Sequence, residues 1–440
     1  MNMSRTTFSR GYTVYLIGLL LLAYTFSFID RQILSLLVEP MKRDLDISDT
    51  QMSLLQGLSF ALFYTILGLP LGRVADSKSR RGLIAAGVFL WSLMTVACGI
   101  AKNYTQLFMA RMGVGVGEAA LSPAAYSLIS DTVEKKHLAT AIGIYTMGIY
   151  LGGGLALIVG GFVVTWASSV STITLPIVGE LYSWQVVFLS VGLPGLLLAP
   201  LFFTITEPPR RNQNNAVKPV VTPVSEVFKY FCDNKSTMLL STLGAAFASL
   251  AAYGSFAWAP TFLIRSHEMA SHHVGLAYGL IVLICGAGGV FSGGMLADRW
   301  YQKGVYDSKV RVAMLAGLCG LIPTIVYPLI PNITGVLVLL AIATYCSNFM
   351  MGLGPAAIQE IVPTSMRGQF SAAYLFVVNM IGLGLGPTAV ALCTDYLFED
   401  ASLLKYSLSI VSSLALALST IMLWRCLPHY RKTFNLLQNN

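Results

Sequence analysis

The chain has 440 residues, of which 55% are hydrophobic and only 11% are charged, whereas globular domains average about 45–50% and about 25%. This composition excludes a water-soluble protein and a disordered one. A net charge of +8 would suit a nucleic-acid binder if the basic residues formed one patch, but they lie between long apolar runs. A membrane-spanning helix needs about 20 apolar residues, so the chain could furnish on the order of twelve.

Apolar runs bounded by charged residues, Gly or Pro predict these helices in chain order. The first six runs cover residues 12–38, 51–71, 83–101, 104–130, 140–166 and 184–205. Six more cover residues 236–264, 274–296, 312–330, 335–358, 369–394 and 403–427. We therefore expect an all-α membrane protein with twelve transmembrane helices.

A polar stretch, residues 207–235, separates the two sets of six runs. It contains four prolines together with Arg210, Arg211 and Lys218, a combination that a helix in the bilayer would not tolerate. Such a composition is typical of a solvated linker. The predicted domains are an N-terminal six-helix bundle at 1–206, a cytoplasmic linker at 207–235 and a C-terminal six-helix bundle at 236–440.

The basic residues between the runs predict the topology. Most of the 28 Lys and Arg residues fall in the segments that share one side with both termini, and cytoplasmic loops are enriched in these residues. Both termini are therefore expected in the cytoplasm, with the chain in the plasma (inner) membrane. The first apolar run is too long for a signal-peptide core. This asymmetry also accounts for the net charge without nucleic acid as a partner.

Several motifs of enzymes and motors are missing from the sequence. The seven Cys residues form no C-x-x-C pair and the five His residues form no H-E-x-x-H set, so neither metal nor redox chemistry is expected. No Gly-Lys dipeptide occurs, which excludes a phosphate-binding P-loop. We expect no cofactor, no metal site and no enzymatic activity.

The two halves share an internal repeat. Gly72 and Asp76 form a G-x-x-x-D pattern after the second run, and Gly294 and Asp298 repeat this pattern after the eighth. Asp131 and Tyr145 recur 229 residues later as Glu360 and Tyr374. Two six-helix bundles built on one plan are typical of secondary transporters, in which the bundles rock about a site between them.

Residues 72–81 and the repeat together resemble the major facilitator superfamily. The stretch is similar to that superfamily's G-x-x-x-D-R-x-G-R-R motif, with Ser77 and Ser79 in place of a basic residue and a glycine. The resemblance implies two pseudo-symmetric six-helix bundles and a latch in which Asp76 holds one conformation while Arg80 or Arg81 lies near Asp131. The predicted latch residues of both halves are Gly72, Asp76, Arg80, Arg81, Asp131, Asp298, Arg299, Glu360 and Arg367.

Four ionisable residues lie inside apolar runs, where each costs about 2.5–3.5 kcal/mol on insertion scales and is a functional hypothesis by default. They are Asp30 and Arg31 in the first run and Arg111 and Glu118 in the fourth. In one interpretation Asp30 pairs with Arg111, or Glu118 with Arg31, as neutralised structural contacts. In the other, the acids bind and release protons and so free an arginine for an anionic solute.

The surroundings of these residues resemble the Spinster family within the superfamily. The resemblance rests on residues 28–31, Phe-Ile-Asp-Arg, and on residues 110–119, Ala-Arg-Met-Gly-Val-Gly-Val-Gly-Glu-Ala. It implies that Asp30 and Glu118 are the proton-responsive pair and that Arg31 and Arg111 are their partners or anion ligands. Family members in animals move lysophospholipids and sphingoid phosphates.

Uncharged residues complete the predicted substrate site. Tyr126, Tyr145 and Trp258 could line an amphipathic pocket, or else face lipid or pack between helices. The amides of Asn348 and Asn379 could face a cavity, because in lipid they would lack partners, or else form interhelical hydrogen bonds.

We therefore expect a secondary active transporter that moves an organic anionic or amphipathic solute by proton-coupled alternating access, with a lysophospholipid-like lipid as one candidate. The alternatives are an intramembrane lipid-modifying enzyme and a signalling receptor without transport. An enzyme would need a nucleophile beside a base or a metal set, and a receptor would not need the matched Asp76 and Asp298. The expected partners are the solute, protons and membrane lipids, and we expect a monomer.

Overall fold

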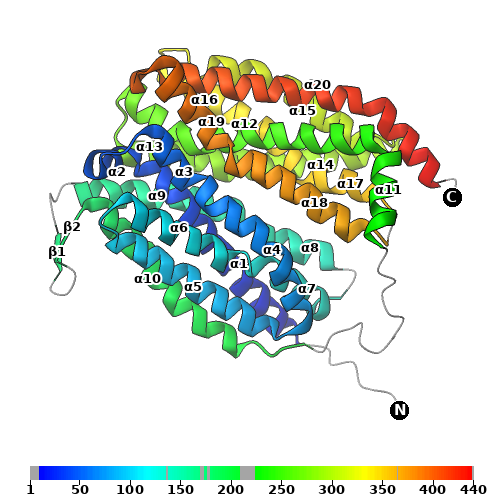
Figure 1. Cartoon of the computed structure of the whole chain (residues 1–440), viewed down its shortest axis with the longest axis horizontal. Coiled ribbons are helices and arrows are strands. Elements are labelled where there is room, and N and C mark those ends of the chain that lie inside the picture. Colours follow the sequence, from blue (N-terminus) through cyan, green and yellow to red (C-terminus); the bar gives the residue numbers. More distant parts are fainter. Residues whose placement is uncertain are drawn as a thin grey trace. The chain divides into compact units, whose positions relative to one another are not determined.

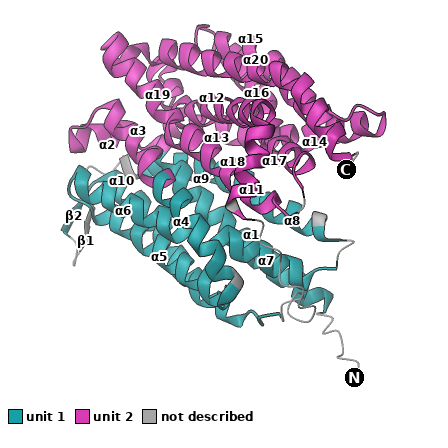
Figure 2. Ribbon diagram, turned by 45° about the vertical axis from the view of Figure 1, so that its right-hand side comes forward, with its two compact units in different colours: residues 1–34, 62–216 teal, residues 35–61, 217–440 magenta. Residues whose placement is uncertain are grey.

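The computed structural model describes residues 9–134, 137–168, 173–175, 179–208, 223–363 and 365–438. The chain forms two compact units, shown in different colours in Figure 2. The first comprises residues 1–34 and 62–216, and the second comprises residues 35–61 and 217–440. Residues 35–61 precede most of the first unit in sequence but fold with the second. The predicted domain boundaries stay a prediction, and residues 209–222 of the predicted linker lie outside the described residues.

Helices make up most of the first unit (Figure 1). They are α1 (Arg10–Gln32), α4 (Leu58–Ser77, whose first turn belongs to the second unit), α5 (Arg80–Ile100), α6 (Tyr104–Glu118), α7 (Leu121–Thr132), α8 (Leu138–Thr146), α9 (Gly148–Ser168) and α10 (Ser183–Leu198). A 3-10 segment, Ala199–Thr204, follows α10. A short antiparallel hairpin, β1 (Ile173–Leu175) and β2 (Gly179–Leu181), pairs Thr174 with Glu180 and was not predicted from the sequence.

The second unit is also helical. Its helices are α2 (Val38–Leu45), α3 (Asp49–Gln56), α11 (Val224–Asp233), α12 (Lys235–His267), α13 (Ser271–Ile281), α14 (Ala287–Gln302), α15 (Ser308–Val326), α16 (Ile333–Asn348), α17 (Met350–Glu360), α18 (Arg367–Asn379), α19 (Gly386–Leu392) and α20 (Leu404–Gln438). Three π-helical segments, Val282–Gly286, Met380–Gly384 and Cys393–Phe398, continue α13, α18 and α19. A 3-10 turn, Ile33–Leu36, leads from α1 into this unit.

Eleven helical stretches of the described chain are long and apolar enough to cross a membrane. One of them, Arg80–Ile100, has 21 residues, which at about 1.5 Å per residue matches the roughly 30 Å hydrocarbon core. The predicted span at 104–130 is the exception because it breaks at Ala119 and Ala120 into α6 and α7. With this interrupted span counted, the predicted all-α protein with twelve transmembrane helices is confirmed.

Close packing of α5 against α6 fixes the position of the charged residues on α6. A Cβ atom on Gly117 would lie 2.6 Å from the Trp91 backbone nitrogen, and one on Gly87 would lie 2.7 Å from the Gly117 carbonyl oxygen. The two backbones can approach this closely only because both positions lack a side chain. Elsewhere in the first unit α10 packs on α5 and α9 on α1, and in the second unit α12 packs on α20 (Figure 1).

Candidate functional site

The four ionisable residues predicted within spans come together in the first unit, where α1 faces α6. Asp30, Arg111 and Glu118 are buried, with exposed fractions of 3%, 1% and 1%. Arg31 occupies the last turn of α1, and its side chain is 13% exposed. An ionised group taken out of water this completely needs a charged partner and hydrogen bonds.

Arg31 is the charged partner of Glu118. The Arg31 Nε atom donates to Glu118 Oε2 at 2.7 Å, and Arg31 Nη2 lies 2.5 Å from the same oxygen. Ser27, one turn earlier on α1, donates its hydroxyl to Oε2 at 2.5 Å. All three contacts fall on one carboxylate oxygen, and among the described residues Oε1 has no hydrogen-bond partner. The carboxylate is therefore only half satisfied.

Asp30 lies in a different environment, although it is the neighbour of Arg31 in sequence. Its Oδ2 atom accepts a hydrogen bond from the Thr95 hydroxyl of α5 at 3.1 Å, and no described residue donates to Oδ1. Arg111 Nη1 donates to the backbone carbonyl oxygen of Asp30 at 3.4 Å. The structure thus brings all four predicted residues into one buried polar region, in which Glu118 is held by Arg31.

Aromatic rings extend from this region along α1. The Arg31 guanidinium lies 4.7 Å from the ring centres of both Phe28 and Tyr64. Tyr24 stacks on Tyr145 at 4.6 Å, and Tyr145 meets Tyr126 edge to face at 5.4 Å. Two of the predicted substrate residues, Tyr126 and Tyr145, therefore adjoin the charged region, and Tyr126 is 39% exposed.

The predicted substrate residues of the second unit make contacts inside that unit. Trp258 is fully buried in α12 and donates its indole N–H to the Pro387 carbonyl oxygen at 2.9 Å. The Asn348 amide donates to the Thr344 carbonyl oxygen of its own helix at 2.7 Å. Asn379 is half-buried at the end of α18, next to a π-helical segment. Their predicted role in substrate binding stays a prediction.

Arg80, a predicted latch residue, is the centre of a charged cluster in the first unit. It is 1% exposed and forms ion pairs with Asp131 and, through Nε at 2.8 Å, with Glu207. Glu207 also accepts hydrogen bonds from the backbone N–H groups of Arg80 and Arg81, at the N-terminus of α5. Burial raises the pKa of Glu207, but the bonds from Arg80, Arg81 and Ser79 outweigh it and hold the pKa below its usual value.

The second unit contains the counterpart of this cluster at the predicted repeat distance. Lys309 forms an ion pair with Glu360, and the hydroxyl of Tyr430 donates to Glu360 Oε2 at 3.0 Å. Both Lys309–Glu360 and Arg80–Asp131 join residues 51 positions apart, and the two pairs are related by the offset of 229. The structure thus gives Glu360 a lysine partner that the sequence analysis did not name.

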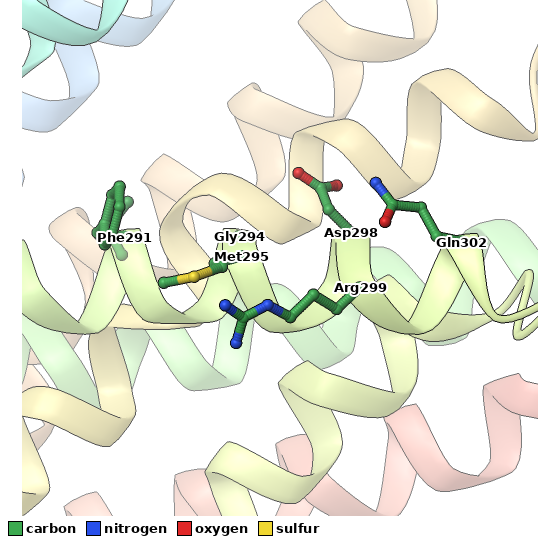
Figure 3. Close-up of a pocket in the computed structure, with 7 residues that line it drawn as sticks. Phe291, Gly294, Met295, Asp298, Arg299 and Gln302 are labelled. Atoms are coloured by element: carbon green, nitrogen blue, oxygen red, sulfur yellow. The ribbon is translucent and has the colours of Figure 1, made fainter.

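Among the described side chains, those of Asp298, Arg299 and Arg367 are not members of these two ion pairs. Gly72 is half-buried in α4, and the side chain of Asp76 lies outside the described residues. The exposed Arg367 donates Nε to the Val362 carbonyl oxygen at 3.2 Å. A groove of about 570 Å³ along α14 (Figure 3) is lined by Val290, Phe291, Gly294, Met295, Asp298, Arg299 and Gln302.

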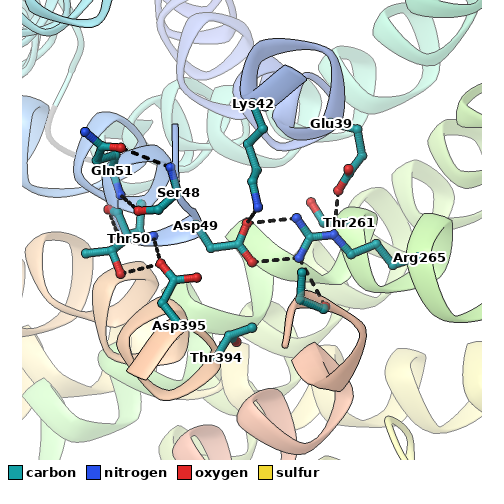
Figure 4. Close-up of polar contacts among 12 residues, drawn as sticks. Glu39, Lys42, Ser48, Asp49, Thr50, Gln51, Thr261, Arg265, Thr394 and Asp395 are labelled. Carbon is teal, nitrogen blue, oxygen red and sulfur yellow. Dashed lines mark hydrogen bonds and ion pairs between the residues drawn. The ribbon is translucent and has the colours of Figure 1, made fainter. Parts of the chain in front are cut away.

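The sequence analysis did not name Glu207 and Lys309. Both lie at the ends of spans, where charged residues are common and therefore inconspicuous. Adding the offset of 229 to Arg80 would have found Lys309. No comparable signal pointed to Glu207, or to an ion cluster around Asp49 and Arg265 in the second unit (Figure 4). Within the described ranges, no group of three or more His, Cys, Asp or Glu side chains is placed to hold a metal ion.

The comparisons with known proteins agree with the fold. A family model described as the Major Facilitator Superfamily matches residues 20–387. The chain belongs to this superfamily. Over 420 residues it is 27% identical to an MFS-type efflux pump of Mycolicibacterium smegmatis, with 94% of this chain and 93% of the pump covered.

The resemblance to the Spinster family is confirmed as well. The chain is 26% identical over 419 residues to protein spinster homolog 1 of Mus musculus, covering 89% of this chain and 75% of the mouse protein. A crystal structure of a bacterial homologue of the human lysosomal transporter Spinster, in an inward-facing and unoccupied conformation, is 28% identical. It covers 97% of this chain and 98% of its own, with a TM-score of 0.76. The protein is thus a transporter of the major facilitator superfamily and of Spinster type.

Proposed function

We propose that this transporter moves an organic anionic or amphipathic solute by proton-coupled alternating access. The observation that carries the proposal is the half-satisfied carboxylate of Glu118, buried beside Arg31. When Glu118 is ionised, it holds the Arg31 guanidinium through Oε2. When it takes a proton, the carboxylate loses its negative charge, the ion pair is lost, and the guanidinium of Arg31, which keeps its positive charge, becomes available to an anion. Proton and solute are then coupled through one arginine.

Asp30 and Arg111 are the second pair in the proposal. Asp30 is buried, and its side chain accepts a hydrogen bond from a hydroxyl. One neutral hydrogen bond offsets only a small part of the free-energy cost of an ionised carboxylate at bilayer depth. A carboxyl group in such a place can gain or lose a proton when water reaches it from one side of the membrane. We propose Asp30 and Glu118 as the proton carriers, and Arg31 and Arg111 as their charge partners and ligands for the solute.

The side chains around Arg31 indicate the solute class. A guanidinium binds phosphate and carboxylate groups in a planar, two-point geometry, and the rings of Phe28 and Tyr64 beside it offer apolar contact area. The stacked Tyr24 and Tyr145 extend this apolar surface. An anionic head next to an apolar body is the chemistry of a lysophospholipid-like lipid, which we propose as the first candidate. Trp258, Asn348 and Asn379 are proposed as further ligands.

Other features of the transporter are part of the proposal. The charged clusters of Arg80 and Glu360 act as latches, and Asp76, Asp298 and Arg299 make further latch contacts outside these two clusters. The bundles comprise residues 1–206 and 236–440, joined by a cytoplasmic linker at 207–235. The protein works as a monomer in the plasma membrane with both termini in the cytoplasm, an orientation supported by the distribution of Lys and Arg.

The test is transport by the purified protein in proteoliposomes under an imposed pH gradient. The probes are lysophosphatidic acid and lysophosphatidylcholine, which differ in head-group charge, and a trapped dye reports the internal pH. We expect Glu118→Gln to abolish gradient-driven flux of the anionic probe and its accompanying proton movement. Glu226→Gln, which neutralises an exposed acid on α11, should transport like the wild type. Unchanged pH dependence in both Glu118→Gln and Asp30→Asn would exclude the proton role.

A further inference from the structure

Thr95 of α5 lies between the Asp30 carboxylate and the backbone of its own helix. Its Oγ1 atom is 3.1 Å from Asp30 Oδ2 and 3.0 Å from the carbonyl oxygen of Trp91, one turn earlier on α5. The threonine side chain is fully buried. Because a hydroxyl carries one proton, Thr95 can donate to only one of these two acceptors at a time. Which of them receives the proton therefore depends on the state of Asp30.

The ionised form of Asp30 fixes the direction of one hydrogen bond. An ionised carboxylate only accepts hydrogen bonds, so the Thr95 hydroxyl donates to Asp30 Oδ2. This charge-assisted bond is the stronger of the two that the hydroxyl can make. The Trp91 carbonyl oxygen still accepts the ordinary bond of an α-helix from the Thr95 backbone N–H, so it keeps a partner when the hydroxyl turns to Asp30.

The protonated form of Asp30 reverses that hydrogen bond. A protonated carboxyl group is a donor, and a proton on Asp30 Oδ2 can be donated to a lone pair of Thr95 Oγ1. The Thr95 hydroxyl then donates to the Trp91 carbonyl oxygen. The three oxygen atoms need not move, because a hydrogen bond between two oxygens can run in either direction across the same distance. One threonine thus serves both the carboxylate and the acid.

Glu118, the other buried acid of the site, has a different kind of partner. Arg31 Nε donates to Glu118 Oε2 at 2.7 Å, and a guanidinium has five donors and no acceptor. A protonated Glu118 therefore gives up its ion pair, whereas a protonated Asp30 keeps its hydrogen bond to Thr95. The hydroxyl makes Asp30 the acid that can change its charge with less rearrangement of its partner.

The position of Thr95 is fixed by the close packing of its helix. The backbone of α6 approaches α5 at Gly117, and α10 approaches α5 at Gly192, where a Cβ atom would lie 2.8 Å from the Val96 backbone nitrogen. The bond from the hydroxyl to the carbonyl oxygen four residues earlier favours one of the two χ1 rotamers that threonine adopts in a helix. The hydroxyl is therefore held next to α1 before the acid changes its state.

We propose that Thr95 is the positioning residue that keeps Asp30 hydrogen-bonded in both of its protonation states. The proposal rests on the proposed role of Asp30 as a proton carrier. The other charged or titratable groups near Asp30 are Arg31 on α1, Arg111 and Glu118 on α6, and Cys98 on α5. The arginines can only donate, Glu118 is held by Arg31, and a thiol is a weak donor and a weak acceptor. Thr95 is the neutral partner that suits both forms of the carboxyl group.

Infrared spectroscopy of the full-length protein in lipid nanodiscs, recorded as the pH is varied, tests the proposal without transport. The C=O stretching band of protonated Asp30 is assigned as the band that Asp30→Asn removes. Thr95→Val keeps the branched shape and removes the hydroxyl, so the band should move to higher wavenumber because the acid has lost the acceptor of its proton. The pH at which the band is half-formed should rise by about one unit, because the ionised form loses the stronger, charge-assisted bond.

Two further variants separate the hydroxyl from the shape of the side chain. Thr95→Ser restores the hydroxyl and should return the band and its midpoint to those of the wild type. The matched control is Thr25→Val in α1. Thr25 is buried, and its hydroxyl donates to the Leu21 carbonyl oxygen four residues earlier at 2.9 Å. The variant removes a bond of the same kind that involves no carboxylate, and it should leave the Asp30 band unchanged.

An unchanged band and midpoint in Thr95→Val would overturn the proposal, and Thr95→Ala decides the question in the same way if the valine variant does not yield folded protein. A change that Thr95→Ser does not reverse, or that Thr25→Val reproduces, would also overturn it, because the hydroxyl would not be the cause. If Asp30→Asn removes no band at any pH, Asp30 has a single protonation state and the proposal fails. If the band responds to Thr95→Val but flux in proteoliposomes is independent of pH, the proposed proton coupling fails and the role of Thr95 stands.

Discussion

The pairing of Arg31 with Glu118 predicts how two substitutions combine. Arg31→Ala removes both guanidinium contacts to Glu118 Oε2 and leaves the Ser27 hydroxyl as its remaining donor. Breaking one side of a buried ion pair costs about 3–5 kcal/mol, because the other charge stays buried without compensation. Glu118→Gln in the same protein removes that charge. We therefore expect the double variant to be about 2–3 kcal/mol more stable than Arg31→Ala alone.

Aromatic contacts of Arg31 are the competing explanation for any loss of stability. Its guanidinium lies over Phe28 and Tyr64, and such cation–π contacts are worth about 0.5–2 kcal/mol. That part of the loss is the same in the single and the double variant, because both lack the arginine. Only the ionic part, which is expected to be larger, is recovered by Glu118→Gln.

Equilibrium unfolding in mixed detergent micelles, followed by tryptophan fluorescence, gives the free energy of unfolding of the wild type and the three variants. The double-mutant cycle then isolates the coupling between the two side chains. A double variant that is as unstable as Arg31→Ala would refute the reasoning. The contribution of Arg31 to the free energy of unfolding would then come from its contacts with the aromatic rings and not from its ion pair with Glu118.

Two further predictions concern the first unit. The pKa of Glu207 is lowered in the folded protein, so its contribution to the free energy of unfolding is fully present above the ordinary pKa of 4.5 and is lost as the pH falls through the folded pKa. At pH 7 the wild type should be about 1–2 kcal/mol more stable than Glu207→Gln. At pH 4 the difference in the free energy of unfolding between the two proteins should be smaller. Gly117→Ala should destabilise by about 1–3 kcal/mol because its methyl group meets the Trp91 backbone. Gly143→Ala, with no atom within 4 Å, should be neutral or mildly stabilising in the same unfolding assay, and equal losses in both glycine variants would contradict the packing argument.

The charged residues of the candidate site could be located from the sequence, but their partners could not. Apolar runs of about 20 residues make any charge within them conspicuous, so Asp30, Arg31, Arg111 and Glu118 were all predicted. Adjacent residues on a helix point about 100° apart, so the choice of Arg31 over Asp30 as the residue facing Glu118 depends on the rotation of α1. Hydropathy carries no information about that rotation.

The sequence by itself determined the membrane-spanning helices, the repeat of 229 residues and the family, because each follows from local composition or from the order of residues. The tertiary structure decided the pairing of Lys309 with Glu360 and the attachment of residues 35–61 to the second unit through Asp49 and Arg265. Charges at the ends of spans are common, and they become specific only when helix packing excludes water and brings an acid and a base within a few ångströms of each other.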